Sequence, residues 1–222
     1  SPFTPSVQVM RSSRIMTFEG GHDAAPFDMM RTKVMQQMRS KNWRRLAVTS
    51  PSSACGKTTI CANLAFSLAR QHDLRTAVIE MDMRRPSLAK ALGLPLGDQQ
   101  FSSVLQDNTP AADHMVRYGM NLAFGLSRKP VRNPSELLQS HTAAEALARL
   151  EKDLALDFTI FDMPPMLASD DMLAFARNVD CVLLIAAAES TSIKEIDICE
   201  RDLAEQTNVL GVVLNKCHYA DQ

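Results

Sequence analysis

The chain has 222 residues, 45% of them hydrophobic, which is enough to bury a substantial core within one domain. Its formal net charge is −1, so no bulk positive field draws it to nucleic acid or anionic lipid, although a local basic patch remains compatible with this balance. The longest apolar run, from Cys181 to Ala188, is far too short to cross a bilayer, and no apolar signal segment opens the chain, so we expect a soluble intracellular domain.

Residues 1–22 mix prolines and glycines with polar residues and show no sustained hydrophobic period. They predict an N-terminal arm or linker that lays a short extended piece on the domain. The residues expected to make that contact are Val7, Val9, Ile15 and Phe18. The domain itself is expected to occupy residues 23–222 and to open with an amphipathic helix from Ala24 to Met38.

A phosphate-binding loop is predicted after the short apolar strand Leu46–Val48. The string SPSSACGKTT ends in Gly56-Lys57-Thr58-Thr59 and leads into a segment with helical spacing. Strand, loop and helix in this order can hold an anion, because backbone N–H groups converge on it, a lysine reaches the outer phosphates and a hydroxyl holds Mg²⁺. The pattern G-x-x-x-x-G-K-[ST] has Pro51 where its first glycine is expected.

Two apolar strands end in acidic residues. The strand that begins at Thr76 runs into Glu80 and Asp82, and a later strand ends at Asp162, after which two prolines take the chain out of the sheet. At the carboxyl ends of parallel strands, such carboxylates can orient a Mg²⁺ water or take a proton from an attacking hydroxyl.

Simpler interpretations stay open for some of these residues. Glu80 and Asp82 could instead form ion pairs with Arg84 or Arg85 at the end of their strand. Asn215, which follows the last predicted strand, offers a donor and an acceptor that match a purine edge, but asparagine is equally common in turns.

The other predicted elements continue the alternation of helix and strand. They are a helix at about 57–71, short helical pieces within 93–118, a weak strand at 120–124, a helix after the basic loop 128–134 capped by Asn133 or Ser135, a helix at 142–154, a helix at 170–177, a strand at 180–187, a helix at 192–206 and a strand at 209–214. This order predicts an α/β fold, a doubly wound and mostly parallel sheet with helices on both faces in three layers, as in P-loop NTPases.

The five cysteines form no C-x-x-C pair, and three of them lie among apolar neighbours in predicted helices or strands. We therefore expect reduced, buried thiols of a cytosolic protein rather than a disulfide or zinc framework.

Five strings occur in the order TSPSSACGKTT, VIEMDMRRP, NPSELLQS, FTIFDMPP and LGVVLNK. Together they resemble the bacterial tyrosine kinase family of capsular and exopolysaccharide synthesis, which belongs to the deviant-Walker ATPases related to the Par and Min partitioning proteins. The resemblance covers roughly residues 24–217. It implies an ATP- and Mg²⁺-dependent tyrosine autokinase in the cytoplasm, recruited to the inner face of the membrane by a polysaccharide co-polymerase that activates it. It also implies a possible homo-oligomer and no nucleic-acid partner.

The resemblance, together with the loop chemistry, assigns roles to individual residues. The catalytic residues would be Lys57, Glu80, Asp82 and Asp162. The metal would be held by Thr58, Asp82 and Asp162. The nucleotide contacts would come from Ser53, Ala54, Cys55, Gly56, Lys57, Thr58, Thr59 and, at the adenine, Asn215.

Several positions depart from the family pattern. Glu80 replaces an aspartate and moves the carboxylate outward by a methylene, which could impair phosphotransfer while leaving nucleotide binding intact. Ala54 replaces a glycine and costs about 1–2 kcal/mol if the loop needs a positive φ there. Met163 replaces a threonine, and of the oligomerisation motif Glu-x-x-Arg-x-x-Arg that would begin at Ala25, only the last arginine, Arg31, is present.

The phosphoacceptor is the largest departure, because relatives end in a tyrosine-rich tail and this chain has only Tyr118 and Tyr219. Tyr219 is either a single acceptor or an ordinary surface tyrosine. Two other functions therefore stay open. One is a nucleotide-cycling regulatory ATPase without tyrosine kinase activity. The other is a Par/Min-type partitioning ATPase, which the near-zero charge, the NPSELL string and the lack of an amphipathic helix after Val213 disfavour.

Overall fold

One seven-stranded sheet organises the part of the chain that the computed structural model describes, residues 1–95, 97–107 and 109–217. Its strand order is β3-β4-β2-β5-β1-β6-β7. The strands are β1 Arg45–Thr49, β2 Thr76–Glu80, β3 Met115–Tyr118, β4 Leu122–Gly125, β5 Phe158–Asp162, β6 Cys181–Ala187 and β7 Asn208–Asn215. β3 runs antiparallel to β4 and the other neighbouring pairs are parallel, which confirms the predicted sheet.

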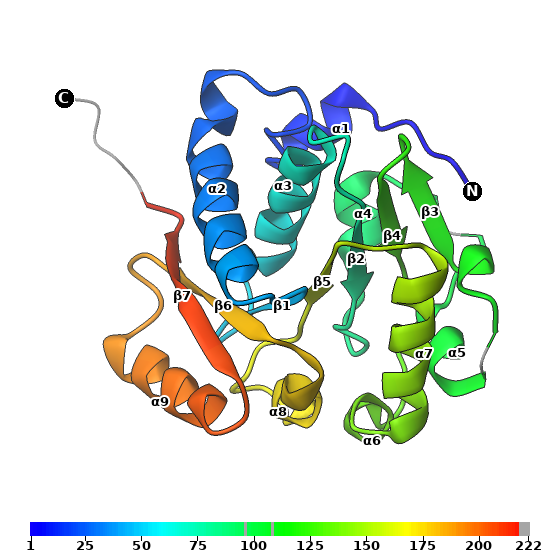
Figure 1. Cartoon of the computed structure of the whole chain (residues 1–222). Coiled ribbons are helices and arrows are strands. Elements are labelled where there is room, and N and C mark those ends of the chain that lie inside the picture. Colours follow the sequence, from blue (N-terminus) through cyan, green and yellow to red (C-terminus); the bar gives the residue numbers. More distant parts are fainter. Residues whose placement is uncertain (96, 108, 218–222) are drawn as a thin grey trace.

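Helices cover both faces of this sheet (Figure 1). One face carries α1 Val7–Ser12, α2 Ala25–Ser40, α3 Lys57–Ala69 and α4 Leu88–Leu92. The other carries α5 Phe101–Asp107, α6 Pro134–Leu138, α7 His141–Asp153, α8 Asp171–Phe175 and α9 Ile193–Ala204. Each helical layer shares a buried apolar cluster with its face of the sheet, so the predicted three-layer arrangement is confirmed. Among the described helices, none is both long and apolar enough to cross a membrane.

Burial explains why the central strands were recognisable in the sequence. All seven residues of β6 are buried, as are all five of β2 and of β5, because helices cover both sides of the sheet there. Helix starts follow local chemistry as well. Ser192 and Glu195 form a capping box before α9, whereas the Asn133 predicted to cap α6 occupies the cap position at φ 50° without a side-chain bond.

Two segments differ from the expectation. Residues 7–12 form helix α1 instead of an extended piece. Met10 and Ile15 are buried in the core. Extended pairing is limited to the start of the arm, where the Phe3 N–H donates to the Arg117 carbonyl (2.9 Å). Strand β3 was not predicted, because it has only four residues between a proline-containing loop and the turn at Gly119 and so offers little alternation to recognise.

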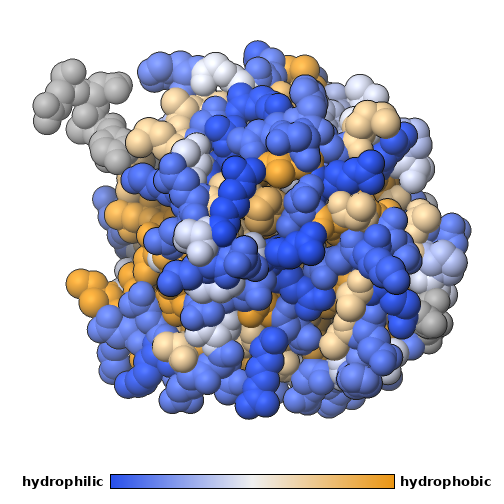
Figure 2. Space-filling model, in the orientation of Figure 1, coloured by the Kyte–Doolittle hydropathy of each residue, from blue (hydrophilic) through white to orange (hydrophobic). Residues whose placement is uncertain are grey.

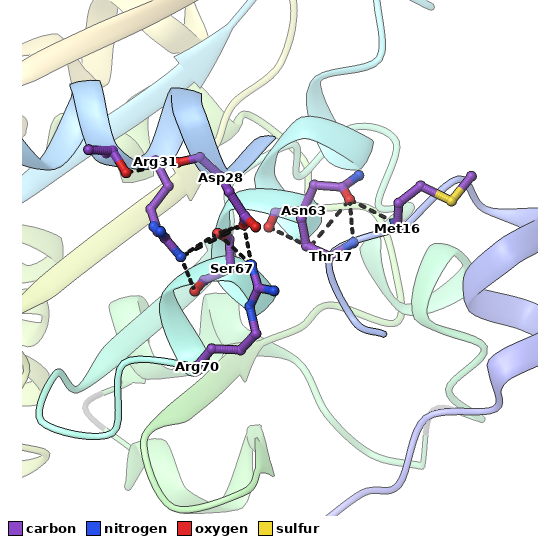
Figure 3. Close-up of polar contacts among 8 residues, drawn as sticks. Met16, Thr17, Asp28, Arg31, Asn63, Ser67 and Arg70 are labelled. Carbon is purple, nitrogen blue, oxygen red and sulfur yellow. Dashed lines mark hydrogen bonds and ion pairs between the residues drawn. The ribbon is translucent and has the colours of Figure 1, made fainter. Parts of the chain in front are cut away.

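The N-terminal arm is fastened to α3 by one buried side chain, Asn63 (Figure 3). Its Oδ1 accepts the N–H groups of Met16 (2.8 Å) and Thr17 (3.2 Å), and its Nδ2 donates to the Arg14 carbonyl (2.9 Å). The Thr17 hydroxyl returns a bond to the Asn63 carbonyl (2.6 Å), and both residues are fully buried. The arm is therefore part of the packed domain at residues 14–17.

A second polar cluster joins α2 to α3 (Figure 3). Asp28 accepts a hydrogen bond from the Ser67 hydroxyl and forms an ion pair with Arg70. Arg31 donates to the Ser67 carbonyl (3.2 Å) and hydroxyl (3.1 Å). Asp28 stands where the oligomerisation motif has its middle arginine, and Arg31 is the last arginine of that motif. Both side chains are thus bound within this chain.

Candidate nucleotide-binding site

A pocket of about 600 Å³ opens at the carboxyl ends of the central strands. β1, β2 and β5 lie side by side there, with Asp162 in register with both Val48 and Glu80. The predicted residues that line this pocket are Ser53, Ala54, Gly56, Lys57, Thr58, Thr59 and Asp82. The sheet topology therefore brings the loop after β1 together with the acidic residues that follow β2 and end β5.

The loop between β1 and α3 has the backbone of an anion cradle. Ala54 and Gly56 both have positive φ, 62° and 93°, and backbone of this kind allows neighbouring N–H groups to converge on an anion. A Cβ on Gly56 would lie 2.3 Å from the Asn215 Nδ2, which explains the glycine there. The loop does need a positive φ at position 54, so the strain of about 1–2 kcal/mol expected for an alanine in the left-handed conformation applies here.

Thr58 and Asp162 are joined directly beneath the pocket. The Thr58 hydroxyl donates to Asp162 Oδ2 (2.7 Å), while Asp162 Oδ1 is buried and has no hydrogen-bond partner among the described residues. Burial raises the pKa of Asp162 to about 6, against the opposing effects of the Thr58 hydrogen bond and the Lys57 charge. A buried carboxylate with one free oxygen is suited to a hard cation or its water.

The residues present fit Mg²⁺, but only as part of a shared site. Thr58, Asp82 and Asp162 would hold it, directly or through water. The described residues include no group of three or more His, Cys, Asp or Glu side chains able to bind a metal unaided. Mg²⁺ typically keeps several waters and completes its octahedron with substrate phosphates. The donor set therefore matches a metal that arrives with a nucleotide.

Asp82 is the carboxylate that faces the pocket. Its Oδ1 accepts the Arg85 N–H (3.1 Å), and burial is the main cause that raises its pKa above the usual value. Among the described residues, neither Glu80 nor Asp82 forms an ion pair with Arg84 or Arg85, and the Arg84 guanidinium instead donates to both carboxylate oxygens of the fully buried Asp171 (2.8 and 2.9 Å). That pair holds the loop after β2 against α8.

Glu80 is not among the residues that line the pocket, although it was predicted to be catalytic. Its side chain is 1% exposed and accepts backbone N–H groups from Ser87 (2.6 Å), Leu88 (2.7 Å) and Ser127 (3.1 Å). Burial raises its pKa to about 7, although the N–H bonds favour the ionised form. The Glu80 carboxylate is thus held by backbone N–H groups and does not line the pocket.

Asn215, at the end of β7, contacts the phosphate loop at Cys55. Asn215 donates from Nδ2 to the Cys55 carbonyl (2.9 Å), so the end of β7 supports the loop from the back. The buried Cys55 thiol lies 3.7 Å from the hydroxyls of Ser52 and Thr191. Burial alone would raise the pKa of Cys55, but these hydrogen bonds together lower it. The contact of Asn215 with adenine stays a prediction.

A second, larger concavity of about 860 Å³ lies between α2 and β7. It is mainly apolar, and its lining includes the exposed side chains of Met29, Val212 and Leu214. Figure 2 shows a largely hydrophilic face whose hydrophobic residues gather toward the β7 side. Lys33 lines this groove, but neither Lys57, an acidic residue nor the positive-φ loop does, so we place the phosphate chemistry in the smaller pocket.

Sequence reasoning missed several pocket residues. Arg84, Arg85, Ser87 and Ser169 also line it. The string RRPS, which follows the acidic strand end directly, was the available signal for three of them, because a loop leaving the carboxyl end of a central strand must pass the pocket. Tyr219, considered as an acceptor, lies outside the described residues.

Comparison with known proteins supports a nucleotide-binding domain. The model of the CobQ/CobB/MinD/ParA nucleotide binding domain matches residues 46–221. The putative tyrosine-protein kinase CapB of Staphylococcus aureus is 30% identical over 192 residues, covering 86% of this chain and 82% of CapB. The tyrosine-protein kinase wzc of Salmonella typhi is 30% identical over 84% of this chain but only 26% of its own length, so the chain spans about a quarter of that relative. The crystal structure of the VpsO kinase domain superposes with a TM-score of 0.77 at 27% identity, covering 88% of this chain and 95% of that domain.

Proposed function

This chain belongs to the CobQ/CobB/MinD/ParA family of nucleotide-binding domains, in the branch of the bacterial tyrosine-protein kinases, and from that premise we propose that it is an ATP-dependent tyrosine kinase domain acting in capsule or exopolysaccharide synthesis. The observation that carries the proposal is that Lys57, Thr58 and Asp82 line one pocket, and that Asp162, which does not line it, accepts the Thr58 hydroxyl proton beneath it (2.7 Å).

The side chains divide the work as follows. The loop N–H groups and Lys57 would hold the phosphates, and Thr58, Asp82 and Asp162 would hold the metal, directly or through water, which would supply charge neutralisation during phosphoryl transfer. Asp82 faces the pocket and takes the proton of the attacking tyrosine hydroxyl, and its raised pKa brings it nearer to the range of an effective general base. ADP leaves as the phosphoryl group passes to the tyrosine oxygen.

The acceptor tyrosine is not Tyr118. Its ring packs against Phe66 (5.1 Å between ring centroids), Phe18 (6.1 Å) and Phe3 (6.2 Å), and it belongs to β3 within the folded domain. We assign the acceptor role to Tyr219 or to a tyrosine of another protein molecule.

A membrane polysaccharide co-polymerase is the proposed activator, and it would bring this domain to the inner face of the cell membrane. Assembly into a homo-oligomer through α2 would have to use contacts other than Asp28 and Arg31, since both already bind Ser67 of α3.

Incubation of the purified protein with labelled ATP and Mg²⁺, alone and with the co-polymerase's cytoplasmic segment, tests the kinase. We expect label on tyrosine that disappears in Lys57→Met, with Lys33→Met on the exposed side of α2 as the matched control. Normal ATP binding with no phosphotyrosine, both without and with the co-polymerase segment, would refute the kinase function. The alternative, a nucleotide-cycling regulatory ATPase, would then be favoured.

A further inference from the structure

Ser87, in the loop that follows β2, lies beside Thr58 in the first turn of α3. Its hydroxyl oxygen lies 3.3 Å from the Thr58 hydroxyl oxygen, and Ser87 lines the nucleotide pocket. We propose that Ser87 is a positioning residue for the metal-binding hydroxyl of Thr58, and that Glu80 holds Ser87 in place for this task. The inference rests on the proposed nucleotide and Mg²⁺ site.

The direction of the Ser87–Thr58 hydrogen bond follows from the neighbours of Thr58. Thr58 has a single hydroxyl proton, and it donates that proton to Asp162 Oδ2 (2.7 Å). Toward Ser87, the Thr58 oxygen can therefore only accept, so Ser87 is the donor. The bonds then run from Ser87 to Thr58 to Asp162.

This arrangement leaves Thr58 with one free direction. A hydroxyl oxygen has one proton and two lone pairs. The proton is fixed by Asp162 and one lone pair by Ser87, so a single lone pair stays available for the cation. Without Ser87, the second lone pair is unassigned and the hydroxyl is held at fewer points. Orientation of a metal ligand by its own hydrogen-bond partners is a general determinant of metal affinity.

The Ser87 hydroxyl is free for this role. Ser87 precedes α4 at the cap position, but its side chain makes no capping bond to that helix. Its place is set through the backbone, since its N–H donates to Glu80 Oε1 at 2.6 Å.

Glu80 fixes the loop from the opposite side. One oxygen accepts the N–H groups of Ser87 and Leu88, and the other accepts the N–H of Ser127, which follows β4. An aspartate would be shorter by one carbon–carbon bond, ~1.5 Å, and could not keep all three bonds without a shift of the backbone. Glutamate at this position is therefore a clamp on the Ser87 loop, and Asp82 is left as the pocket-facing acid.

The experiment measures fluorescent ADP binding to the full chain across a Mg²⁺ titration and in EDTA. Ser87→Ala is expected to raise the Mg²⁺ concentration at half-saturation by roughly 2–10-fold, the equivalent of one hydrogen bond, and to change the affinity measured in EDTA by a smaller factor. Ser87→Thr, which keeps a hydroxyl, should restore the wild-type value. Ser12→Ala on α1, also an exposed serine, is the matched control.

Glu80→Asp should shift the Mg²⁺ dependence in the same direction, but it should add little in the Ser87→Ala background, because both act through one hydroxyl. An unchanged Mg²⁺ half-saturation in Ser87→Ala would overturn the role of Ser87. Equal shifts from Glu80→Asp in both backgrounds would overturn the role of Glu80. Failure of the wild type itself to bind Mg²⁺-nucleotide would instead refute the proposed function.

Discussion

Replacing Ala54 with glycine is expected to stabilise the protein at the phosphate loop. Ala54 is exposed and has a φ of 62°, a conformation that costs an alanine about 1–2 kcal/mol. Glycine removes that strain but gives the unfolded chain more freedom, which takes back about 0.4–1 kcal/mol. The net gain in the free energy of unfolding should be about 0.5–1 kcal/mol, or roughly 1–4 °C in Tm for a chain of this size.

Thermal and urea unfolding of the nucleotide-free protein measure this gain, with an unchanged urea m-value as the sign that only stability has moved. Ala155→Gly is the matched control, because Ala155 is also exposed and has a φ of 49° but follows α7, outside the pocket lining. Both variants should gain stability. A loss of stability in Ala54→Gly beside a gain in Ala155→Gly would show that the loop does not hold Ala54 in a strained state.

Two further predictions concern buried or paired carboxylates. Burial raises the pKa of Asp162 to about 6, so the ionised carboxylate destabilises the nucleotide-free fold. The free energy of unfolding should therefore fall as the pH rises from about 4 to about 6. Asp162→Asn should remove this pH dependence and raise the free energy of unfolding by about 1–3 kcal/mol at pH 8, as measured by urea unfolding in EDTA. A pH profile identical to that of the wild type would contradict it. For Asp28, burial would raise the pKa, but the hydrogen bonds from Ser67 and Arg70 outweigh this effect and hold the pKa low. The stabilisation that Asp28 gives the folded state is therefore present above its unfolded-state pKa near 4 and is lost as the pH falls below that value. Asp28→Asn should cost about 1 kcal/mol at pH 7 and less at pH 3, and an equal cost at both pH values would argue against the pairing.

The sequence was informative where structure depends on local pattern. The apolar run of β6 and the acid at the end of β5 lie in strands buried on both faces, so composition alone marks them. The string at Gly56-Lys57-Thr58 likewise encodes its own strand–loop–helix geometry. These features predict the phosphate loop and half of the residues that line the pocket.

Side-chain direction was beyond the sequence where it depends on distant backbone. Glu80 is oriented by Ser127, 47 residues away, and Asn215 by the Cys55 carbonyl, 160 residues away. Neither partner has a recognisable motif, because a backbone N–H or C=O group is present at nearly every position. Helix α1 of the arm was missed for a related reason, since Met10 joins an apolar cluster with residues of α2, α3 and α4 rather than with its own segment.

The hydrogen bonds between Asn63 and residues 14–17 affect how the N-terminal arm detaches from the domain. Peeling residues 14–17 from α3 would leave a fully buried amide without the partners it now has in the arm, and such unpaired groups cost about 1–3 kcal/mol each. Fraying of the arm is therefore coupled to loosening of α3, the helix that begins at Lys57. In native-state hydrogen exchange, we expect the amides of Met16 and Thr17 to exchange in the same cooperative unit as the phosphate-loop helix, so protection at the beginning of the chain should report on the integrity of the nucleotide pocket.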